Sequence, residues 1–163
     1  MKNQPVEKTN TMRTLEKFGV SYVAHEYAAD KECPPSGTEV AAMLGLDASA
    51  VFKTLVTEGK SLAHFVFVVP VESELDLKKA AAAVGEKSVA MLPQKKLLPL
   101  TGYVHGGCSP IGMKKQFATV IDKSAQSKDK IYFSAGKIGL QVEVSPAELP
   151  RALRFHYADI TRD

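Results

Sequence analysis

Residue types and patterns that mark several large functional classes are scarce or missing in this chain. It contains no tryptophan and only two cysteines, Cys33 and Cys108, which do not form a CxxC pair. We therefore expect neither a disulfide framework nor a cysteine-rich zinc site. The four histidines show no HExxH or other ligand spacing, so no metal is expected. Walker A and GxGxxG sequences are also absent, and we expect no organic cofactor.

Long apolar runs and a strong charge of one sign are missing as well. The longest apolar run, residues 65–71, is far too short to cross a bilayer, and the polar N-terminus lacks a signal peptide's hydrophobic region. We expect no membrane association and a cytoplasmic location. The net charge of +3 does not by itself indicate nucleic-acid binding, although short lysine clusters are spread along the chain.

What is present is enough for a folded core. The 163 residues have 45% hydrophobic composition, which fits one domain. We predict a flexible N-terminus over residues 1–8 and a single domain over residues 9–163.

Periodicity and turn signals predict a mixed α/β order. Capping residues and helical spacing predict helices over residues 12–18, 36–44, 76–84 and 145–153, with a helical turn at 93–98. Strand formers predict strands over residues 21–27, 51–57, 61–69, 88–92, 117–121, 130–134, 140–144 and 154–160, with a hairpin turn at 58–60. These strands could close a mixed sheet.

Two features point to a site for an anionic or strongly polar ligand. The loop over residues 102–112 contains two adjacent glycines, which leave backbone N–H groups bare, followed by Ser109 and Pro110. Converging N–H groups can bind a phosphate oxygen or the oxyanion of acyl transfer. Lys53 lies in an apolar strand, where its ammonium needs water or an anionic partner. A purely structural lysine with its head in solvent remains an alternative.

The loop also contains Cys108, near His105, and a thiolate there could act as a nucleophile. Adjacency in sequence does not supply the geometry that such a pair needs. A small, unreactive loop residue is the competing interpretation of Cys108.

Four segments together resemble the YbaK/EbsC family, the stand-alone relatives of the prolyl-tRNA synthetase editing domain. They are KTN followed by MR at residues 8–13, VFKTL at 51–55, the loop 102–112, and SAGKIGLQ at 134–141. The resemblance covers nearly the whole chain in the same order. It implies a mixed α/β fold with a strongly bent, barrel-like, mostly antiparallel sheet surrounded by helices. It also implies hydrolysis of the ester that joins a wrong amino acid to tRNA, above all cysteine on the proline tRNA.

The resemblance carries over a set of site residues. Lys53 would hold the 3′-terminal nucleotide and its ester, N–H groups around Gly107 would stabilise the oxyanion, and Ser134 would orient the aminoacyl group or a water. Ser134 could equally cap its own turn. The implied substrate-binding residues are Tyr22, Thr54, Gly106, Ser109, Pro110 and Gly136.

The resemblance leaves several functional alternatives open. For a cysteinyl ester, the substrate's own thiol could attack the carbonyl, so that the protein mainly positions and stabilises. Another small aminoacyl group such as alanine, or a binding module without turnover, remains open. Mischarged tRNA, with the proline tRNA first, and a transient complex with prolyl-tRNA synthetase are the partners implied.

Overall fold

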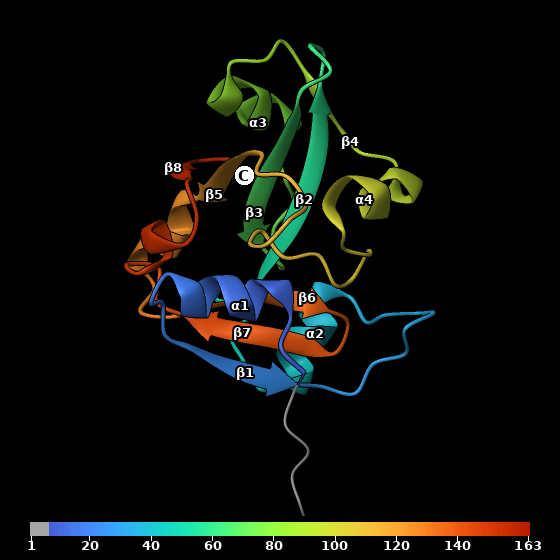
Figure 1. The fold of residues 1–163 in the computed structure, drawn as a ribbon. Helices are drawn as coiled ribbons and strands as arrows, with labels where there is room; N and C mark the ends of the chain where they lie inside the picture. The colour runs from blue at the N-terminus through green and yellow to red at the C-terminus, as the bar shows by residue number, and fades with distance from the viewer. Residues whose placement is uncertain (1–6) are drawn as a thin grey trace, which may run out of the picture.

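The computed structural model describes residues 7–163, and its helices and strands follow the expected mixed order (Figure 1). Residues 1–6, most of the predicted flexible segment, lie outside this description, and the single-domain expectation stays a prediction. The helical segments are α1 (Asn10–Lys17), α2 (Gly37–Met43), α3 (Leu77–Val84), α4 (Gln94–Thr101) and the 3₁₀ turns η1 (Lys123–Ser127) and η2 (Leu149–Arg151). The strands are β1 (Tyr22–Glu26), β2 (Phe52–Gly59), β3 (His64–Pro70), β4 (Val89–Met91), β5 (Ala118–Asp122), β6 (Ile131–Lys137), β7 (Leu140–Val144) and β8 (His156–Ala158).

The strands of residues 7–163 form two sheets. One has the order β1-β7-β6 and is antiparallel throughout, and the other has the order β4-β2-β3-β5-β8. Only the β3–β5 and β5–β8 pairs are parallel, so the described pairing is mostly antiparallel, as expected.

The barrel-like closure implied by the resemblance is not found in the described residues. The two sheets meet at a single parallel bridge between Val51 and Tyr132, beside a hydrogen bond from Tyr132 N to Ala50 O. The chain turns immediately before this point, where Ala50 N donates to Asp47 O. The architecture is therefore a pair of adjoining sheets rather than a closed barrel.

Strand β3 separates two buried clusters. Phe65, Phe67 and Val69 face the cluster beneath α3, whereas Val66 and Val68 face the larger cluster that includes Met12 and Leu15 of α1 and Phe133 of β6. Successive side chains of a strand point to opposite faces, so a strand covered on both faces must be apolar without interruption. This placement explains the continuous apolar run in the sequence.

Local capping signals are confirmed where they were strongest. The Ser36 side chain accepts from Glu39 N while the Glu39 side chain accepts from Ser36 N, which is a complete capping box for α2. Asp76 caps α3, and Gly85 ends it in the left-handed region at φ 72°. Capping residues satisfy N–H groups that the first helical turn leaves without partners.

Several boundary predictions were wrong. The hairpin turn begins at Lys60 rather than at residue 58, because Glu58 still pairs with His64 and Gly59 ends β2. Strand β6 runs on to Lys137 rather than ending at residue 134. Helix α4 runs on to Thr101 rather than ending at residue 98. The helix predicted over residues 145–153 contains only the short 3₁₀ turn η2, since Pro150 has no N–H to continue an α-helical ladder.

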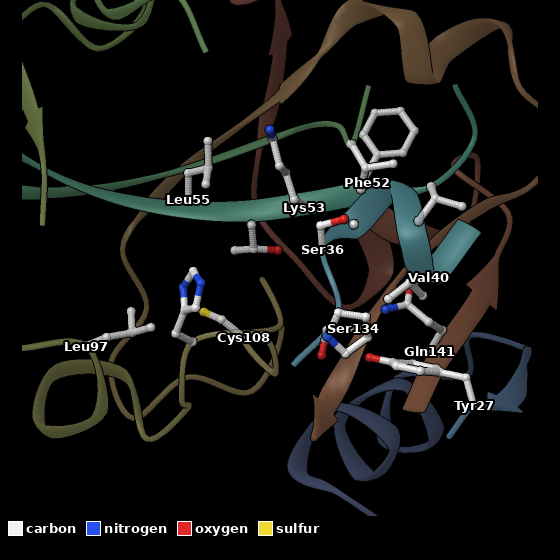
Figure 2. A pocket seen from close by; sticks show the side chains of 17 residues that line it. Tyr27, Ser36, Val40, Phe52, Lys53, Leu55, Leu97, Cys108, Ser134 and Gln141 are labelled. Atoms are coloured by element: carbon white, nitrogen blue, oxygen red, sulfur yellow. The ribbon is translucent and has the colours of Figure 1, made fainter. Parts of the chain in front are cut away.

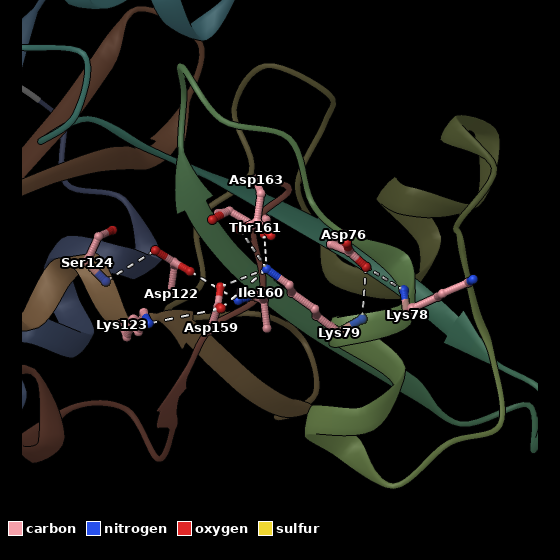
Figure 3. Close-up of polar contacts among 10 residues, drawn as sticks. All are labelled: Asp76, Lys78, Lys79, Asp122, Lys123, Ser124, Asp159, Ile160, Thr161 and Asp163. Carbon is pink, nitrogen blue, oxygen red and sulfur yellow. Dashed lines mark hydrogen bonds and ion pairs between the residues drawn. The ribbon is translucent and has the colours of Figure 1, made fainter.

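Polar contacts fix both ends of the described chain. Lys8 Nζ lies 2.6 Å from Glu16 Oε1, and the Thr9 hydroxyl caps α1. Near the C-terminus, Lys79 Nζ donates to Asp159, Asp163 and the Thr161 carbonyl (Figure 3). No helix in residues 7–163 combines the length and apolar character needed to cross a bilayer.

Candidate active site

A cavity of about 310 Å³ lies between β2, the start of α2, the loop around residue 106 and the facing ends of β6 and β7 (Figure 2). Of the residues predicted from sequence to form a site, Lys53, Thr54, Gly106 and Ser134 line it. Lys53 and Ser134, about 80 residues apart in sequence, thus meet in one place. The other residues predicted for the site lie outside the lining: Tyr22, Gly107, Ser109, Pro110 and Gly136.

Lys53 is a half-buried cation at one side of the cavity. Its backbone pairs with Val69, which fixes it on the rigid β2–β3 ladder. Burial lowers the pKa of its ammonium below the ordinary value, and the nearby Glu74 carboxylate partly opposes this shift. Figure 2 shows the Lys53 and Leu55 side chains rising from one side of β2, with Ser134 and Cys108 on the other. The side chain can therefore meet an anionic group at the rim of the cavity.

The two adjacent glycines are required by the chain that packs behind them. A Cβ on Gly106 would lie 2.9 Å from the Pro34 side chain, and Gly106 also has φ +87°. A Cβ on Gly107 would lie 2.8 Å from Ile138 N and 3.1 Å from Lys137 C. Gly106 lines the cavity and Gly107 does not, and the Gly107 N–H already donates to Val104 O at 3.0 Å. The absence of a side chain at both glycines therefore lets this loop approach Pro34 and the turn between β6 and β7 closely.

Ser109 and Pro110 are buried behind the cavity rather than lining it. Ser109 Oγ accepts from Ile111 N at 3.1 Å, and the Ile111 carbonyl accepts from Tyr103 Oη at 2.6 Å. Thr11 Oγ1 donates to the same carbonyl at 3.1 Å. These buried bonds tie the loop to α1 and give it a fixed conformation, as hydrogen bonds of buried polar groups do.

Ser134 and Gly136 lie at the irregular end of β6. Ser134 Oγ accepts from Gly136 N at 3.1 Å, so this hydroxyl does cap its own turn while it also lines the cavity. Gly136 has φ +94°, and a Cβ there would lie 2.7 Å from Cε1 of Tyr103. The turn is thus packed on the same Tyr103 ring whose hydroxyl holds the loop.

Tyr22 does not line the cavity. It lies on β1 opposite Val144, and its hydroxyl donates to Glu16 Oε2 at 2.8 Å. Partial burial and this carboxylate raise the pKa of Tyr22 to about 12. A direct role in ligand binding stays a prediction for this residue.

Cys108 lines the cavity as a neutral thiol. Burial raises the pKa of its thiol to about 12. Because the thiolate is the nucleophile, this environment argues against the cysteine hydrolase interpretation. Residues 7–163 hold no cluster of three or more His, Cys, Asp or Glu side chains arranged to bind a metal ion.

Sequence reasoning missed Gln141 as a functional candidate. It lies on β7 in register with Ser134 and lines the cavity, whereas its neighbours Leu140 and Val142 belong to the core on the opposite face. The sequence did contain a signal: Gln141 is a polar residue between two apolar positions of a strand, which places its side chain on the face opposite to the core. Tyr27 and Ser36 also line the cavity without having been singled out for it.

The fold and the site define a class of protein, a two-sheet α/β protein whose cavity combines a strand lysine, a glycine loop and a serine turn. A model of the aminoacyl-tRNA editing domain family matches residues 35–152, and this chain belongs to that family. The resemblance drawn from the sequence motifs is thereby confirmed.

Individual relatives agree with this assignment. A protein of Enterococcus faecalis, EbsC, named as a candidate Cys-tRNA(Pro)/Cys-tRNA(Cys) deacylase, is 44% identical over 160 residues, covering 98% of this chain and 97% of the relative. The crystal structure of a candidate trans-editing enzyme for prolyl tRNA synthetase has a TM-score of 0.81 at 23% identity, over 94% of this chain and 96% of the other. That of a hypothetical protein has a TM-score of 0.85 at 23% identity, over 94% and 100%. The two structures support the fold.

Proposed function

We propose that this protein is a trans-editing deacylase that removes a wrongly attached amino acid from tRNA, with cysteine on the proline tRNA as its main substrate. The observation that carries the proposal is the meeting of Lys53, the Gly106 loop and Ser134 around one cavity in a member of the editing family. The name of the E. faecalis relative supports the choice of cysteine and of the proline tRNA.

The cavity offers a division of roles for ester cleavage. Lys53 holds the phosphate or ribose oxygens of the 3′-terminal nucleotide at the rim, where an ammonium acts as a point charge. The Gly107 N–H is already bonded to Val104 O, so we assign the oxyanion contact to the amide of Gly106. Ser134 orients the aminoacyl group, and Thr54 contacts it from β2. Ser109, Pro110 and Gly136 act by positioning the loop and the turn.

Cleavage of a cysteinyl ester uses the substrate's own thiol as the nucleophile. The sulfur attacks the ester carbonyl, a C–S bond forms, the C–O bond to the ribose breaks, and the thiol proton passes to the ribose oxygen. Water then opens the thiolactone to free cysteine. An intramolecular nucleophile is effective because the thiol is covalently tethered near the carbonyl, so its attack loses little translational and rotational entropy. This chemistry needs neither Cys108 nor a metal or organic cofactor.

The same proposal implies its partners. Mischarged tRNA is the substrate, the lysine clusters supply weak contacts to its backbone, and a transient complex with prolyl-tRNA synthetase delivers it. We also propose a cytoplasmic location, because aminoacyl-tRNA is made and used there.

The test compares hydrolysis of Cys-tRNA and Ala-tRNA, both on the proline tRNA, by the parent protein, Lys53→Ala and the surface control Lys60→Ala. We expect selective release of cysteine, lost in Lys53→Ala and retained in Lys60→Ala, since Lys60 is an exposed residue of the β2–β3 turn outside the lysine clusters. Selective alanine release would keep the deacylase class and change the substrate. Release of neither amino acid, with retained tRNA binding, would replace the enzyme by a binding module.

A further inference from the structure

We infer that Gln141, together with Thr54, recognises the free α-ammonium group of the aminoacyl moiety, so that the site selects aminoacyl esters whose amino group is unmodified. This inference rests on the proposed function and names the group of the substrate that the cavity selects.

The first observation is an unpartnered polar atom in a buried residue of the lining. Gln141 is only 6% exposed, and its Oε1 has no hydrogen-bond partner in the described chain. Thr54 Oγ1, also buried, has no partner either, and both residues line the cavity. A buried acceptor without a partner is costly, so a ligand donor that reaches either oxygen would make the hydrogen bond that the chain itself leaves unmade.

The second observation is how charge is distributed in the lining. None of the 17 lining residues is Asp or Glu, so a cationic group in this cavity would have only neutral oxygens as acceptors. Figure 2 shows Gln141 near Ser134 and Tyr27, on the side of β2 opposite to the Lys53 side chain. The cavity therefore has a cation at one side and neutral acceptors at the other. An ester of an amino acid with a nucleotide has the complementary polarity, because its phosphate is anionic and its α-amino group is cationic.

Gln141 is held rigidly enough to select a ligand. It lies on β7, the central strand of its sheet, and pairs with His25 on β1 and with Ser134 on β6. Sites on paired strands position a side chain more precisely than sites on loops. An ammonium offers three donors and makes charge-assisted hydrogen bonds, which a thiol, a weak donor, does not.

The experiment measures binding of a non-cleavable probe, adenosine carrying cysteine in 3′-amide linkage, and of its N-acetyl derivative. We expect the parent to prefer the free amine, and the near-isosteric Gln141→Met to lose about 10-fold to 100-fold in affinity for it with little change for the acetylated probe. Gln141→Glu, which keeps an acceptor, should retain the preference. The control Gln126→Met, on the exposed surface of η1, should match the parent.

A second measurement uses turnover on Cys-tRNA and N-acetyl-Cys-tRNA. Acetylation also changes the reactivity of the ester, so the compared quantity is the ratio of the two rates, which should shift toward unity in Gln141→Met. Equal binding of both probes by the parent, with Cys-tRNA still hydrolysed, would overturn the inference and leave the proposed function standing. Absence of both binding and hydrolysis in the folded parent would overturn the two together.

Discussion

Replacing Gly107 by alanine tests whether the second glycine of the loop serves packing or ligand access. The new Cβ would lie 2.8 Å from Ile138 N, at least 0.6 Å closer than the 3.4 Å at which ordinary van der Waals contact begins. Both nearest atoms belong to the backbone of the β6–β7 turn, so no side-chain rotation relieves the overlap. The loop or the turn must therefore shift.

The expected cost of this substitution follows from the behaviour of overpacked interiors. Forcing a methyl group into close-packed chain typically costs about 1–3 kcal/mol of the free energy of unfolding. For a protein of this length, each kcal/mol lowers Tm by roughly 2–4 °C, so we expect a fall of about 2–12 °C in thermal unfolding followed by circular dichroism. Activity should fall as well, because Gly106 lines the cavity next to the displaced residue.

Gly59→Ala is the matched control. Its Cβ would approach Glu86 Oε1 to 2.5 Å, but these contacts are with a flexible side chain rather than backbone. The Glu86 side chain can rotate away at the cost of its exposed hydrogen bonds from Ser61 N and Ser61 Oγ. We expect its Tm to change by less than that of Gly107→Ala. If Gly107→Ala unfolds at the temperature of the parent and yet loses activity, the packing argument is wrong and the glycine serves the ligand directly.

Three further outcomes follow from the environments of single side chains. Lys53→Met should abolish deacylation without lowering Tm, because burial already disfavours the ammonium and lowers its pKa; a clear loss of Tm would mean that Lys53 is chiefly structural. With a thiol pKa of about 12, a fraction of roughly 10⁻⁴ of Cys108 should be thiolate at pH 8. Iodoacetamide should therefore label only the exposed Cys33, as mass spectrometry can show. Equal labelling of both cysteines would contradict this environment. Asp122→Ala should cost about 1–3 kcal/mol in chemical denaturation, because it leaves the buried Ile160 N–H without its carboxylate acceptor; an unchanged midpoint would show that the C-terminal segment is held by other contacts.

The sequence was most informative where a signal is local. The capping box of Ser36 and Glu39, the stop at Gly85 and the strand around Lys53 depend on residues within one or two turns or on simple alternation. Such signals act through short-range hydrogen bonds and backbone preferences, which the structure retains. The helix predicted over residues 145–153 was wrong because a good N-terminal signal was outweighed by Pro150.

The candidate site was predicted less completely because its members meet through tertiary packing. Lys53 and Ser134 were found from the sequence, and the structure brings both to the cavity. Ser109 was grouped with them, yet it does not line the cavity, and its hydroxyl accepts a hydrogen bond from Ile111 N. Gln141 was passed over, although it is in register with Ser134 on the neighbouring strand. The alternation within β6 or within β7 does not reveal which residues pair across the bulged turn between them, so this contact could not be predicted from the sequence.

By itself, then, the sequence determined the family, the order of helices and strands, and the presence of a lysine strand, a glycine loop and a serine turn in one chain. Only the tertiary structure decided that the strands form two adjoining sheets, that Gly107 is small because a turn packs against it, and that Gln141, whose side-chain oxygen has no partner in the described chain, lines the cavity. The physical reason is range. Local order follows from backbone preferences within a few residues, whereas a cavity is made by side chains whose distances depend on how every sheet and loop packs.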